Sequence, residues 1–516
     1  MPAADRKRPA ARRRGRWADA GALAAGLALP LAFAPFSLYP VAVLSPAVLF
    51  AVWRCAAPGR AAWRGFLYGA GAFSVGVSWV YVSLHEFGNM PAALAGVTVG
   101  LFVGLLALFP ALAGWAQARL CPAGSPVCAV LAQPAAWVLC EWMRGWAFTG
   151  FPWLSLGYSQ VASPLAGLAP LAGVHGVGLA VAVTAAALAA AVGTPRRTAA
   201  AMLLVAGAVW ALGAAAGTAQ WTRPDGPALR AALVQGNVAL ERKWRAEERG
   251  TIIEHYLSLS EDVAGADVIL WPEAAIPGFL HDLGEPFWER LRRLTGQGST
   301  VMFGALERDL DAPGKPYYNV VVAVDAGGRH LYRKRHLVPF GEYLPLSGLF
   351  GWLLDYLSIP MSDFAAWSGV QGPLPAGAVR VGVSICYEDA FGAEARRVLP
   401  GASVLANFSE DAWFGDSLGP RQRLDMARMR ALESGRPALR VANTGISAAF
   451  DAGGREIART RQFVVDVLPV SVQPRQGATP YVRTGDAPVL GVALALAGLG
   501  GWRARRVEKR AGIASR

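Results

Sequence analysis

The segment Val381-Gly-Val-Ser-Ile-Cys386-Tyr387-Glu388-Asp389 predicts a short buried strand that ends in a cysteine followed by two carboxylates. Small and β-branched residues are typical of such a strand. A thiol at the end of a strand lies at the rim of a sheet, where a substrate can reach it. A free cysteine can also pack as a small hydrophobic residue, so Cys386 alone does not distinguish a nucleophile from a core residue.

Cys386 is separated from the other cysteines of the chain. The long polar half of the sequence contains no second cysteine, so Cys386 has no disulfide partner within its own domain. The other four lie in or beside apolar segments of the first half, and they are Cys55, Cys121, Cys128 and Cys140.

The composition indicates a membrane protein of more than one domain. Hydrophobic residues make up 54% of the 516-residue chain and charged residues only 16%, which is unusual for a soluble protein. The net charge is +13, and basic residues crowd the two ends, at 6–16 and 503–510. Such blocks can bind nucleic acid, but beside apolar segments they are more typical of the cytoplasmic side of a membrane.

Apolar runs near the 20 or so residues that span a bilayer predict about eight transmembrane helices. They lie at 19–37, 39–56, 65–84, 91–116, 126–141, 165–193, 199–219 and 487–502. The first run could pass for a signal peptide, but further spans follow at once without a clear cleavage site. We expect a basic N-terminus (1–18), a seven-helix membrane domain (19–220), a catalytic domain (221–486), a final helix (487–502) and a basic tail (503–516).

The loop charges orient this topology. With the N-terminus in the cytoplasm, the loops that carry Arg54 to Arg64, Arg119, and Arg196 with Arg197 all fall inside, and the domain 221–486 falls outside. Arg144, in the outside loop 141–158, is the one exception. That loop is rich in aromatic residues, and it is either an interfacial belt or a lipid-facing floor beneath an active site; the two interpretations are compatible.

From Leu229 the pattern changes to short β-type runs alternating with charged helical stretches. Strands are predicted at 229–235, 267–271, 300–305, 318–325, 329–333, 380–385, 402–407, 438–442, 447–451 and 456–460. Helices are predicted at 245–264, 286–295 and 420–434. This alternation favours a layered sandwich in which helices cover sheets.

Three segments of this domain carry residues suited to acyl chemistry. They are Leu270-Trp271-Pro272-Glu273, the run from Tyr332 to Tyr343 that contains Lys334, and Cys386-Tyr387-Glu388. A thiol that attacks an acyl carbon needs a base, and Glu273 can serve, with its pKa raised by burial and by the nearby nucleophile. The oxyanion that forms needs a cation and a backbone N–H, which Lys334 and the amide of Tyr387 can supply.

Two further carboxylates, Glu342 and Glu388, are expected to keep Lys334 charged and oriented. A Cys–His enzyme is the competing design. Among the histidines of this domain only His336 lies near one of the three segments, which makes that design the less favoured one.

The three segments in this order resemble the Glu-Lys-Cys triad of the carbon–nitrogen hydrolase (nitrilase) superfamily, whose domain is an αββα sandwich. Further runs are similar to the apolipoprotein N-acyltransferase family of bacterial lipoprotein-maturation enzymes. These are Val234 to Asn237 with Lys243-Trp244, Tyr332 to Tyr343, Asn407 to Asp416, and Met426 to Glu433 with Arg436-Pro. The resemblance covers essentially the whole chain, and it implies a polytopic α-helical membrane domain plus a nitrilase-like αββα domain.

The resemblance implies that Glu273 is the base, Lys334 the oxyanion-stabilising cation and Cys386 the nucleophile. It also implies supporting or substrate-contacting roles for Glu342, Tyr387, Glu388, Trp244 and Trp413. Where the family usually has Ser-Asn-Asp-Ala-Trp, this chain has Ser409-Glu410-Asp411-Ala412-Trp413. We expect Glu410 to alter substrate contacts near the thiol without touching the triad.

The implied reaction is ping-pong. Cys386 takes an acyl chain from a phospholipid as a thioester, and the chain passes to the α-amino group of a diacylglyceryl-cysteine at the N-terminus of an apolipoprotein. An acyl donor that resides in a bilayer explains why an acyl-transfer domain is joined to so many spans. We expect a monomer in the bacterial inner membrane with its catalytic domain in the periplasm, without cofactor, metal or nucleic acid.

The stretch 344–360, between Lys334 and Cys386, is too apolar for an ordinary exposed loop. It predicts either a lid that dips toward the membrane at the acyl entrance or a core helix.

Two rival functions remain open. In a membrane-tethered amidase or nitrilase, water would replace the amine as acyl acceptor. In a transporter or receptor, ionisable residues would line a pathway inside the spans, and the predicted spans contain almost none.

Overall fold

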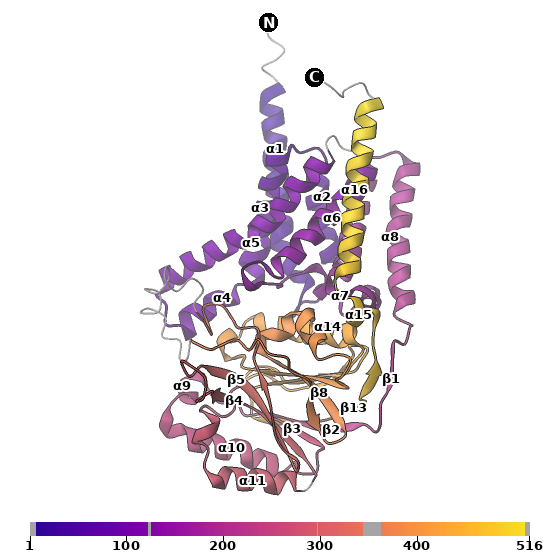
Figure 1. The fold of residues 1–516 in the computed structure, drawn as a ribbon. Helices are drawn as coiled ribbons and strands as arrows, with labels where there is room; N and C mark the ends of the chain where they lie inside the picture. Colours follow the sequence, from indigo (N-terminus) through magenta and orange to yellow (C-terminus); the bar gives the residue numbers. More distant parts are fainter. Residues whose placement is uncertain (1–6, 122–124, 297, 344–362, 511–516) are drawn as a thin grey trace. The chain divides into compact units, whose positions relative to one another are not determined.

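The computed structural model describes residues 7–121, 125–296, 298–343 and 363–510, and the chain forms two compact units. The first unit is helical and comprises the described parts of 1–81, 93–219 and 484–516. The second comprises 82–92 and the described parts of 220–483. Figure 1 shows coiled helices in the first unit and layered strands with covering helices in the second.

The helical unit is built from long apolar helices. They are α1 (Lys7–Ala28), α2 (Val41–Trp53), α3 (Pro58–Gly76), α5 (Ala92–Leu120), α6 (Pro126–Arg144), α7 (Ala169–Ala191), α8 (Arg196–Ala216) and α16 (Ala487–Arg510). The short α4 (Trp79–Val82) lies at the boundary of the unit. Small residues let the helices approach closely: a Cβ on Gly65 of α3 would lie 2.2 Å from the carbonyl oxygen of Pro110 in α5.

Within the described residues, five helices are long and apolar enough to cross a membrane. They are Ala92–Leu120, Pro126–Arg144, Pro164–Ala191, Arg196–Ala216 and Ala487–Arg506. A sixth is added if the bent pair Pro58–Gly76 and Trp79–Phe87 forms one span. The first two predicted spans are less regular: α1 carries many charges in its first half, and α2 has only 13 residues, because Pro30, Pro35 and Pro40 interrupt the intervening apolar run.

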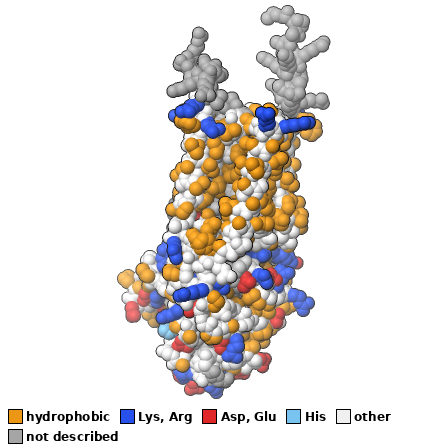
Figure 2. Space-filling model, turned by 90° about the vertical axis from the view of Figure 1, so that its right-hand side faces the viewer, with side chains coloured by type: hydrophobic (Ala, Val, Ile, Leu, Met, Phe, Trp, Pro, Cys, Tyr) orange, Lys and Arg blue, Asp and Glu red, His pale blue; other side chains and the backbone are white. Residues whose placement is uncertain are grey.

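The surface of the helical unit suits a lipid environment. Figure 2 shows apolar side chains over its flank, and Leu101 and Leu204 are exposed by 72% and 74%. The start of α1 and the end of α16 lie at the same end of the unit (Figure 1). This agrees with the prediction that both basic ends of the chain share one side of the membrane.

The aromatic loop after α6 folds back into the helical unit. Arg144, the exception to the charge pattern, is buried and donates to the carbonyl oxygens of Phe151 and Trp153. Trp153 and Tyr158 are buried, whereas Trp146 and Phe148 are exposed. The aromatic residues of this loop are therefore divided between the interior of the helical unit and its surface.

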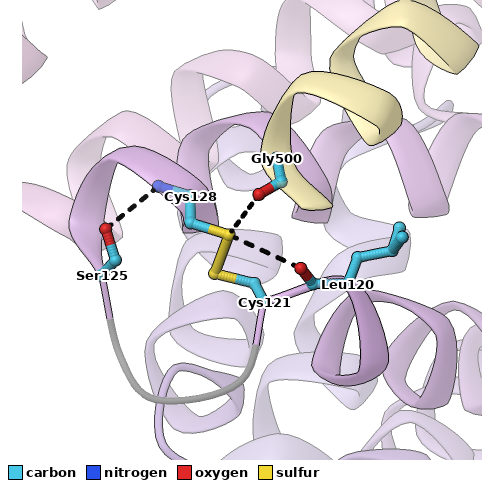
Figure 3. The surroundings of a disulfide bond; sticks show 5 residues. All are labelled: Leu120, Cys121, Ser125, Cys128 and Gly500. Atoms are coloured by element: carbon cyan, nitrogen blue, oxygen red, sulfur yellow. Dashed lines mark hydrogen bonds between the residues drawn. A yellow bond between two sulfur atoms is a disulfide. The ribbon is translucent and has the colours of Figure 1, made fainter. Parts of the chain in front are cut away.

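A disulfide joins Cys121, just after α5, to Cys128 in the first turn of α6 (Figure 3). The sulfur of Cys128 lies 3.4 Å from the carbonyl oxygen of Gly500 in α16 and 3.9 Å from that of Leu120. The predicted topology places this connection in the cytoplasm, where thiols are usually reduced. A reduced Cys128 would find both carbonyls as acceptors.

The second unit has two six-stranded sheets. One has the order β12-β11-β10-β9-β8-β7 and the other β13-β2-β3-β4-β5-β6. The strands of the first sheet are β7 (Leu374–Ala376), β8 (Val379–Ile385), β9 (Val404–Ser409), β10 (Ala438–Ala442), β11 (Ala448–Phe450) and β12 (Glu456–Arg459). Those of the second are β2 (Leu229–Gln235), β3 (Val268–Leu270), β4 (Thr300–Arg308), β5 (Tyr317–Asp325), β6 (Gly328–Arg333) and β13 (Asp466–Val472). The short strands β1 (Thr222–Pro224) and β14 (Arg475–Gly477) form a separate pair.

The sheets pack face to face, and helices cover their outer faces. Apolar side chains of β2 to β5 meet those of β8 to β10 in a shared core, with Leu233, Val321 and Phe408 fully buried. Helices α10 (Arg249–Glu261) and α11 (Glu285–Thr295) cover the second sheet, and α14 (Gly419–Ser434) covers the first. The short helices α9 (Leu240–Lys243), α13 (Gly392–Arg397) and α15 (Pro480–Thr484) lie in connections. The predicted αββα sandwich is confirmed.

The predicted strands and helices are all present, with shifts of a few residues at their ends, but some strands were not predicted. The longest of these is β13, which pairs with β2 at the edge of its sheet. Its Pro469 lacks a backbone donor, a feature that argues against a strand in the sequence but is tolerated at a sheet edge. The short strands β1, β7 and β14 were also not predicted.

The strand directions gather several chain ends at one edge. Strands β2, β3 and β4 are mutually parallel, as are β8, β9 and β10. Glu273 follows β3, and Cys386 follows β8. Lys334 follows β6, which runs in the direction of β4 because both are antiparallel to β5.

We expect Gly304→Ala to lower the midpoint of thermal unfolding of the solubilised protein. A Cβ on Gly304 of β4 would lie 2.4 Å from the amide nitrogen of Ala274 and 2.5 Å from the carbonyl oxygen of Pro272. Backbone atoms cannot move aside easily, and overpacking of this kind costs about 1–3 kcal/mol. Gly372→Ala is the matched control, since its Cβ would have no atom within 4 Å. Equal midpoints for the two variants would contradict this packing of β4.

Candidate active site

The residue after β8 is held in an unusual conformation. Cys386 has φ of +48°, in the left-handed region that non-glycine residues seldom adopt. The chain then turns into a short helical segment, Cys386–Ala390. The turn presents the partly exposed thiol at the end of the strand instead of continuing the sheet. Strained conformations of this kind often occur at functional sites.

Glu388 fixes this turn and connects it to the segment that carries the lysine. Its carboxylate accepts the N–H of Ile385 at 2.7 Å, the N–H of Arg335 at 2.7 Å and the hydroxyl of Tyr332 at 3.0 Å. Burial raises the pKa of Glu388 to about 7, although these backbone donors oppose the shift. None of these bonds reaches Lys334, although the Lys334 charge acts on Glu388. Glu388 holds the backbone just before Cys386 and just after Lys334.

Lys334 is almost completely buried between two carboxylates. Its Nζ lies 2.7 Å from Oε1 of Glu342 and 3.2 Å from Oε1 of Glu273. Burial alone would lower the pKa of Lys334, but the charges of Glu273 and Glu342 raise it well above its usual value. The predicted contact of Glu342 with Lys334 is therefore present, and Lys334 is a permanent cation.

Glu273 is held by donors on both of its oxygens. Oε1 accepts from Asn319 at 2.7 Å as well as from Lys334, and Oε2 accepts the N–H of Glu410 at 2.8 Å. Burial by itself raises the pKa of Glu273, but Lys334, Asn319 and the Glu410 amide together hold it below its usual value. The predicted upward shift is wrong because the sequence did not reveal this set of donors. The resting group is a carboxylate, ready to accept a proton.

The thiol shows the opposite shift. Desolvation raises the pKa of Cys386 to about 11, and the Glu273 carboxylate adds to this effect, while Arg423 and Lys334 oppose it. The resting pair is therefore a neutral thiol beside an ionised carboxylate. A neutral thiol needs a proton acceptor as its sulfur attacks, and an ionised carboxylate is a group that can accept a proton.

The competing Cys–His design finds no support in the position of His336. Its imidazole stacks on Phe391 with ring centroids 4.0 Å apart and meets the ring of Tyr387 edge-on. The charges that act on the thiol come instead from Glu273, Arg423, Lys334 and Glu342.

Glu410 contradicts the expectation that it does not touch the triad. Its backbone N–H donates to Glu273, and its carboxylate forms a buried ion pair with Lys243. Lys243 also donates to the carbonyl oxygen of Glu273 at 3.0 Å, and Asn443 donates to Glu410 at 2.9 Å. The Glu410–Lys243 pair thus contacts Glu273 through the Glu410 amide and the Lys243 ammonium.

The remaining predicted site residues lie around this centre. Tyr387 is buried beside Phe391, and Trp244 directly follows the helical turn that ends with Lys243. The carbonyl oxygen of Trp413 accepts from Ser83 at 2.7 Å, and its ring meets that of Phe87 edge-on. The segment 82–92 is accordingly part of this unit. The apolar stretch 344–360 lies outside the described residues.

Sequence reasoning gave no role to three residues of the site. Asn319 lies within an apolar strand, where a lone buried amide is a usable signal of a polar partner. Lys243 and Arg423 sit in ordinary charged helical segments, and nothing in their spacing marks them as buried. Among the described residues, no group of three or more His, Cys, Asp or Glu side chains is arranged to hold a metal ion.

An αββα sandwich in which a Glu–Lys pair and a strand-end cysteine share one edge defines an enzyme of the carbon–nitrogen hydrolase type, here joined to membrane-length helices. The carbon–nitrogen hydrolase model matches residues 230–481, and the model of the apolipoprotein N-acyltransferase N-terminal domain matches residues 25–188. The chain belongs to the apolipoprotein N-acyltransferase family.

Curated relatives agree over nearly the full chain. The apolipoprotein N-acyltransferase of Methylococcus capsulatus is 44% identical over 94% of this chain and 96% of its own length. Proteins of the same name from Nitrosomonas europaea and Vibrio cholerae are 42% and 40% identical, each over 94% of this chain and over 98% and 96% of their own lengths.

We expect the alkylation of Cys386 by iodoacetamide to rise about tenfold per pH unit between pH 7 and 10, because only the thiolate reacts and its pKa is raised to about 11. Glu273→Gln removes a charge that raises this pKa, so the variant should react faster at pH 8. Peptide mass spectrometry measures the rate, with the exposed Cys55 as the reference in the same sample. A rate that levels off below pH 9 would contradict the neutral resting thiol.

We expect Glu410→Gln to destabilise the protein by about 3–5 kcal/mol, since it leaves the Lys243 ammonium buried without its counter-charge. Adding Lys243→Met to the same protein should recover most of the loss. The midpoint of thermal unfolding of the two single variants and the double variant gives the coupling. Additive losses would mean that the two side chains do not stabilise one another.

Proposed function

We propose that this protein transfers an acyl chain from a membrane phospholipid to the α-amino group of the diacylglyceryl-cysteine at the N-terminus of an apolipoprotein. The observation that carries the proposal is the ion pair of Glu273 and Lys334, which follow strands of one sheet, acting on the thiol of Cys386, which follows a strand of the other. Membership of a family whose named relatives are apolipoprotein N-acyltransferases supplies the substrate class.

The first half-reaction forms a thioester. The sulfur of Cys386 attacks the ester carbonyl of the phospholipid while the thiol proton passes to Glu273. The oxyanion is stabilised by the Lys334 ammonium and the backbone N–H of Tyr387. When the C–O bond breaks, Glu273 gives the proton to the departing oxygen, which becomes the hydroxyl of the lysophospholipid.

The second half-reaction transfers the acyl chain to nitrogen. The neutral α-amine attacks the thioester carbonyl, a C–N bond forms and the C–S bond breaks. The proton lost by the amine passes through Glu273 to the sulfur, which restores the thiol. Lys334 again faces the oxyanion, and Glu342 and Asn319 keep the ammonium and the carboxylate in place.

The remaining site residues are proposed to serve binding and orientation. Glu388 holds the turn at Cys386, and Tyr387 supplies an amide to the oxyanion. Trp244 and Trp413 are proposed to contact substrate.

We infer that the protein lies in the bacterial inner membrane with residues 221–486 in the periplasm. The support is the positive-inside pattern of the loops, the basic ends 1–18 and 503–516, and five membrane-length helices among the described residues. One chain supplies every proposed catalytic residue, so we propose that it acts as a monomer, without a cofactor.

The test is the intact mass of the purified protein after incubation with phospholipid. We expect a mass increase of one acyl chain that is absent in Cys386→Ala and is discharged by a diacylglyceryl-cysteine peptide. Glu273→Gln and Lys334→Met should lower the acylation rate by at least about a hundredfold, because they remove the proton acceptor and the oxyanion cation.

Two outcomes would overturn the proposal. An adduct that water discharges as fast as the peptide does, with release of free fatty acid, would identify a membrane-tethered hydrolase. A correctly folded protein that forms no adduct with phospholipid would show that Cys386 does not take an acyl chain from it. Ser384→Ala is the control for folding and detergent effects, because Ser384 lies just before the turn at Cys386 but takes no part in the proposed chemistry.

A further inference from the structure

A buried arginine lies against the sulfur of the proposed nucleophile. Arg423, on α14, is 0% exposed, and its Nη1 lies 3.2 Å from Sγ of Cys386. Its Nη2 donates to the carbonyl oxygen of Cys386 and to Oδ1 of Asp389, the latter at 2.7 Å. One guanidinium therefore holds the backbone of the turn and faces the reacting atom at the same time.

The charges around the sulfur are asymmetric. On one side, Glu273 and Glu342 place two formal negative charges against the single positive charge of Lys334. On the other side, Arg423 and Arg440 are balanced by Asp389 and Asp411. A negative sulfur is thus repelled from the side of the base and attracted to the side of Arg423.

We propose that Arg423 is a fourth catalytic residue, whose guanidinium stabilises the negative charge on the Cys386 sulfur when the thioester forms and when it breaks. The inference deepens the function proposed above and rests on it for the reaction. The contact with the sulfur itself is independent of the substrate.

The need for such a group follows from the chemistry of both half-reactions. During acylation the S–H bond breaks as the C–S bond forms, and the proton goes to Glu273. During transfer the C–N bond forms, the C–S bond breaks and its electron pair returns to the sulfur before the proton arrives from Glu273. Lys334 faces the carbonyl oxygen in both steps, so the sulfur requires a second cation. Arg423 keeps its own protons throughout.

Arginine suits this position better than lysine. Its planar fork of N–H donors can serve a sulfur, a carbonyl oxygen and a carboxylate at once, and it stays charged even when buried. Burial alone would lower the pKa of Arg423, but Asp389 and the neighbouring Cys386 and Asp411 raise it well above its usual value. The cation is therefore present at every working pH.

A purely structural role is the alternative, since Arg423 also holds the turn. The first experiment separates the two by measuring the sulfur directly. Alkylation of Cys386 by iodoacetamide is followed from pH 7 to 10 in the full-length solubilised protein, by peptide mass spectrometry. We expect Cys386 to be alkylated about tenfold to a hundredfold more slowly at pH 8 in Arg423→Gln than in the parent protein, because the thiolate loses a charge-assisted hydrogen bond. The alkylation rate of Arg423→Lys should lie between those of Arg423→Gln and the parent protein.

Two control variants accompany this measurement. Arg440→Gln removes a buried arginine of the same cluster, bound to Asp389 and Asp411, and should change the alkylation profile far less. Arg421→Gln removes an arginine of the same helix that lies 3.7 Å from Asp416, and should leave the profile unchanged. The midpoint of thermal unfolding of each variant shows that it is folded.

An Arg423→Gln protein that is folded and alkylated with the parent profile would overturn the proposal. If Arg423→Gln does not fold, Arg423→Lys is tested in its place, because a lysine side chain cannot keep all three contacts of Arg423. An alkylation profile of Arg423→Lys equal to that of the parent would then overturn the proposal. A shift of equal size in Arg440→Gln would assign the effect to the cluster as a whole and would also overturn it.

The second experiment concerns the reaction itself. The thioester is preloaded from phospholipid and then discharged with a diacylglyceryl-cysteine peptide. We expect discharge from Arg423→Gln to be at least about tenfold slower than from the parent, because the departing thiolate has lost its cation. An unchanged discharge rate would remove Arg423 from the transfer step. If the parent protein forms no thioester, the proposed function fails, whereas the alkylation profile still decides the role of Arg423.

Discussion

The buried contact between Glu273 and Lys334 is the constraint on which the catalytic unit depends. Both side chains are largely withdrawn from water, and their charges lie 3.2 Å apart. Removing one partner of such a pair costs about 3–5 kcal/mol, because the other remains charged in a poor solvent. Glu342 shares the compensation of Lys334, and Asn319 and the Glu410 amide share that of Glu273. Glu273 and Lys334 follow different strands of one sheet, so their pairing depends on the assembly of that sheet. The chemistry and the fold are therefore coupled.

Hydrogen bonds from neighbouring groups fix the geometry around the Glu273–Lys334 pair. Asn319 divides its donors between Glu273 and Glu342, and the Glu410 amide closes the other side of the Glu273 carboxylate. Glu388 fastens the turn at Cys386 to the backbone after Lys334. Each of these groups joins segments that are distant along the chain. Such connected polar networks specify one arrangement of the interior, since a partly satisfied network would be costly.

The charge states follow from this network and define how the proton moves. A carboxylate with a lowered pKa and a thiol with a raised pKa form a neutral-thiol resting state, in contrast to the thiolate–imidazolium pair of many cysteine enzymes. In the proposed mechanism the thiolate forms only in transit, with Lys334 at the oxyanion and Arg423, whose Nη1 lies 3.2 Å from the sulfur, at the thiolate.

The elements of the second unit and the candidate triad of Glu273, Lys334 and Cys386 could be predicted from the sequence alone. The Leu270-Trp271-Pro272-Glu273 and Val381 to Cys386 segments predicted strands that end in a functional group, because a buried strand has a clear apolar signature and a polar residue at its end interrupts it. The membrane-length helices were predicted for a similar local reason, except where prolines shorten the first two. What the sequence did not contain was the set of neighbours. The pKa of Glu273 was predicted with the wrong sign, Glu410 was thought remote from the triad, and Lys243 and Arg423 were overlooked. All four depend on contacts between residues that are far apart in the chain, and only the packing of the two sheets and α14 brings those donors to the carboxylate and the sulfur.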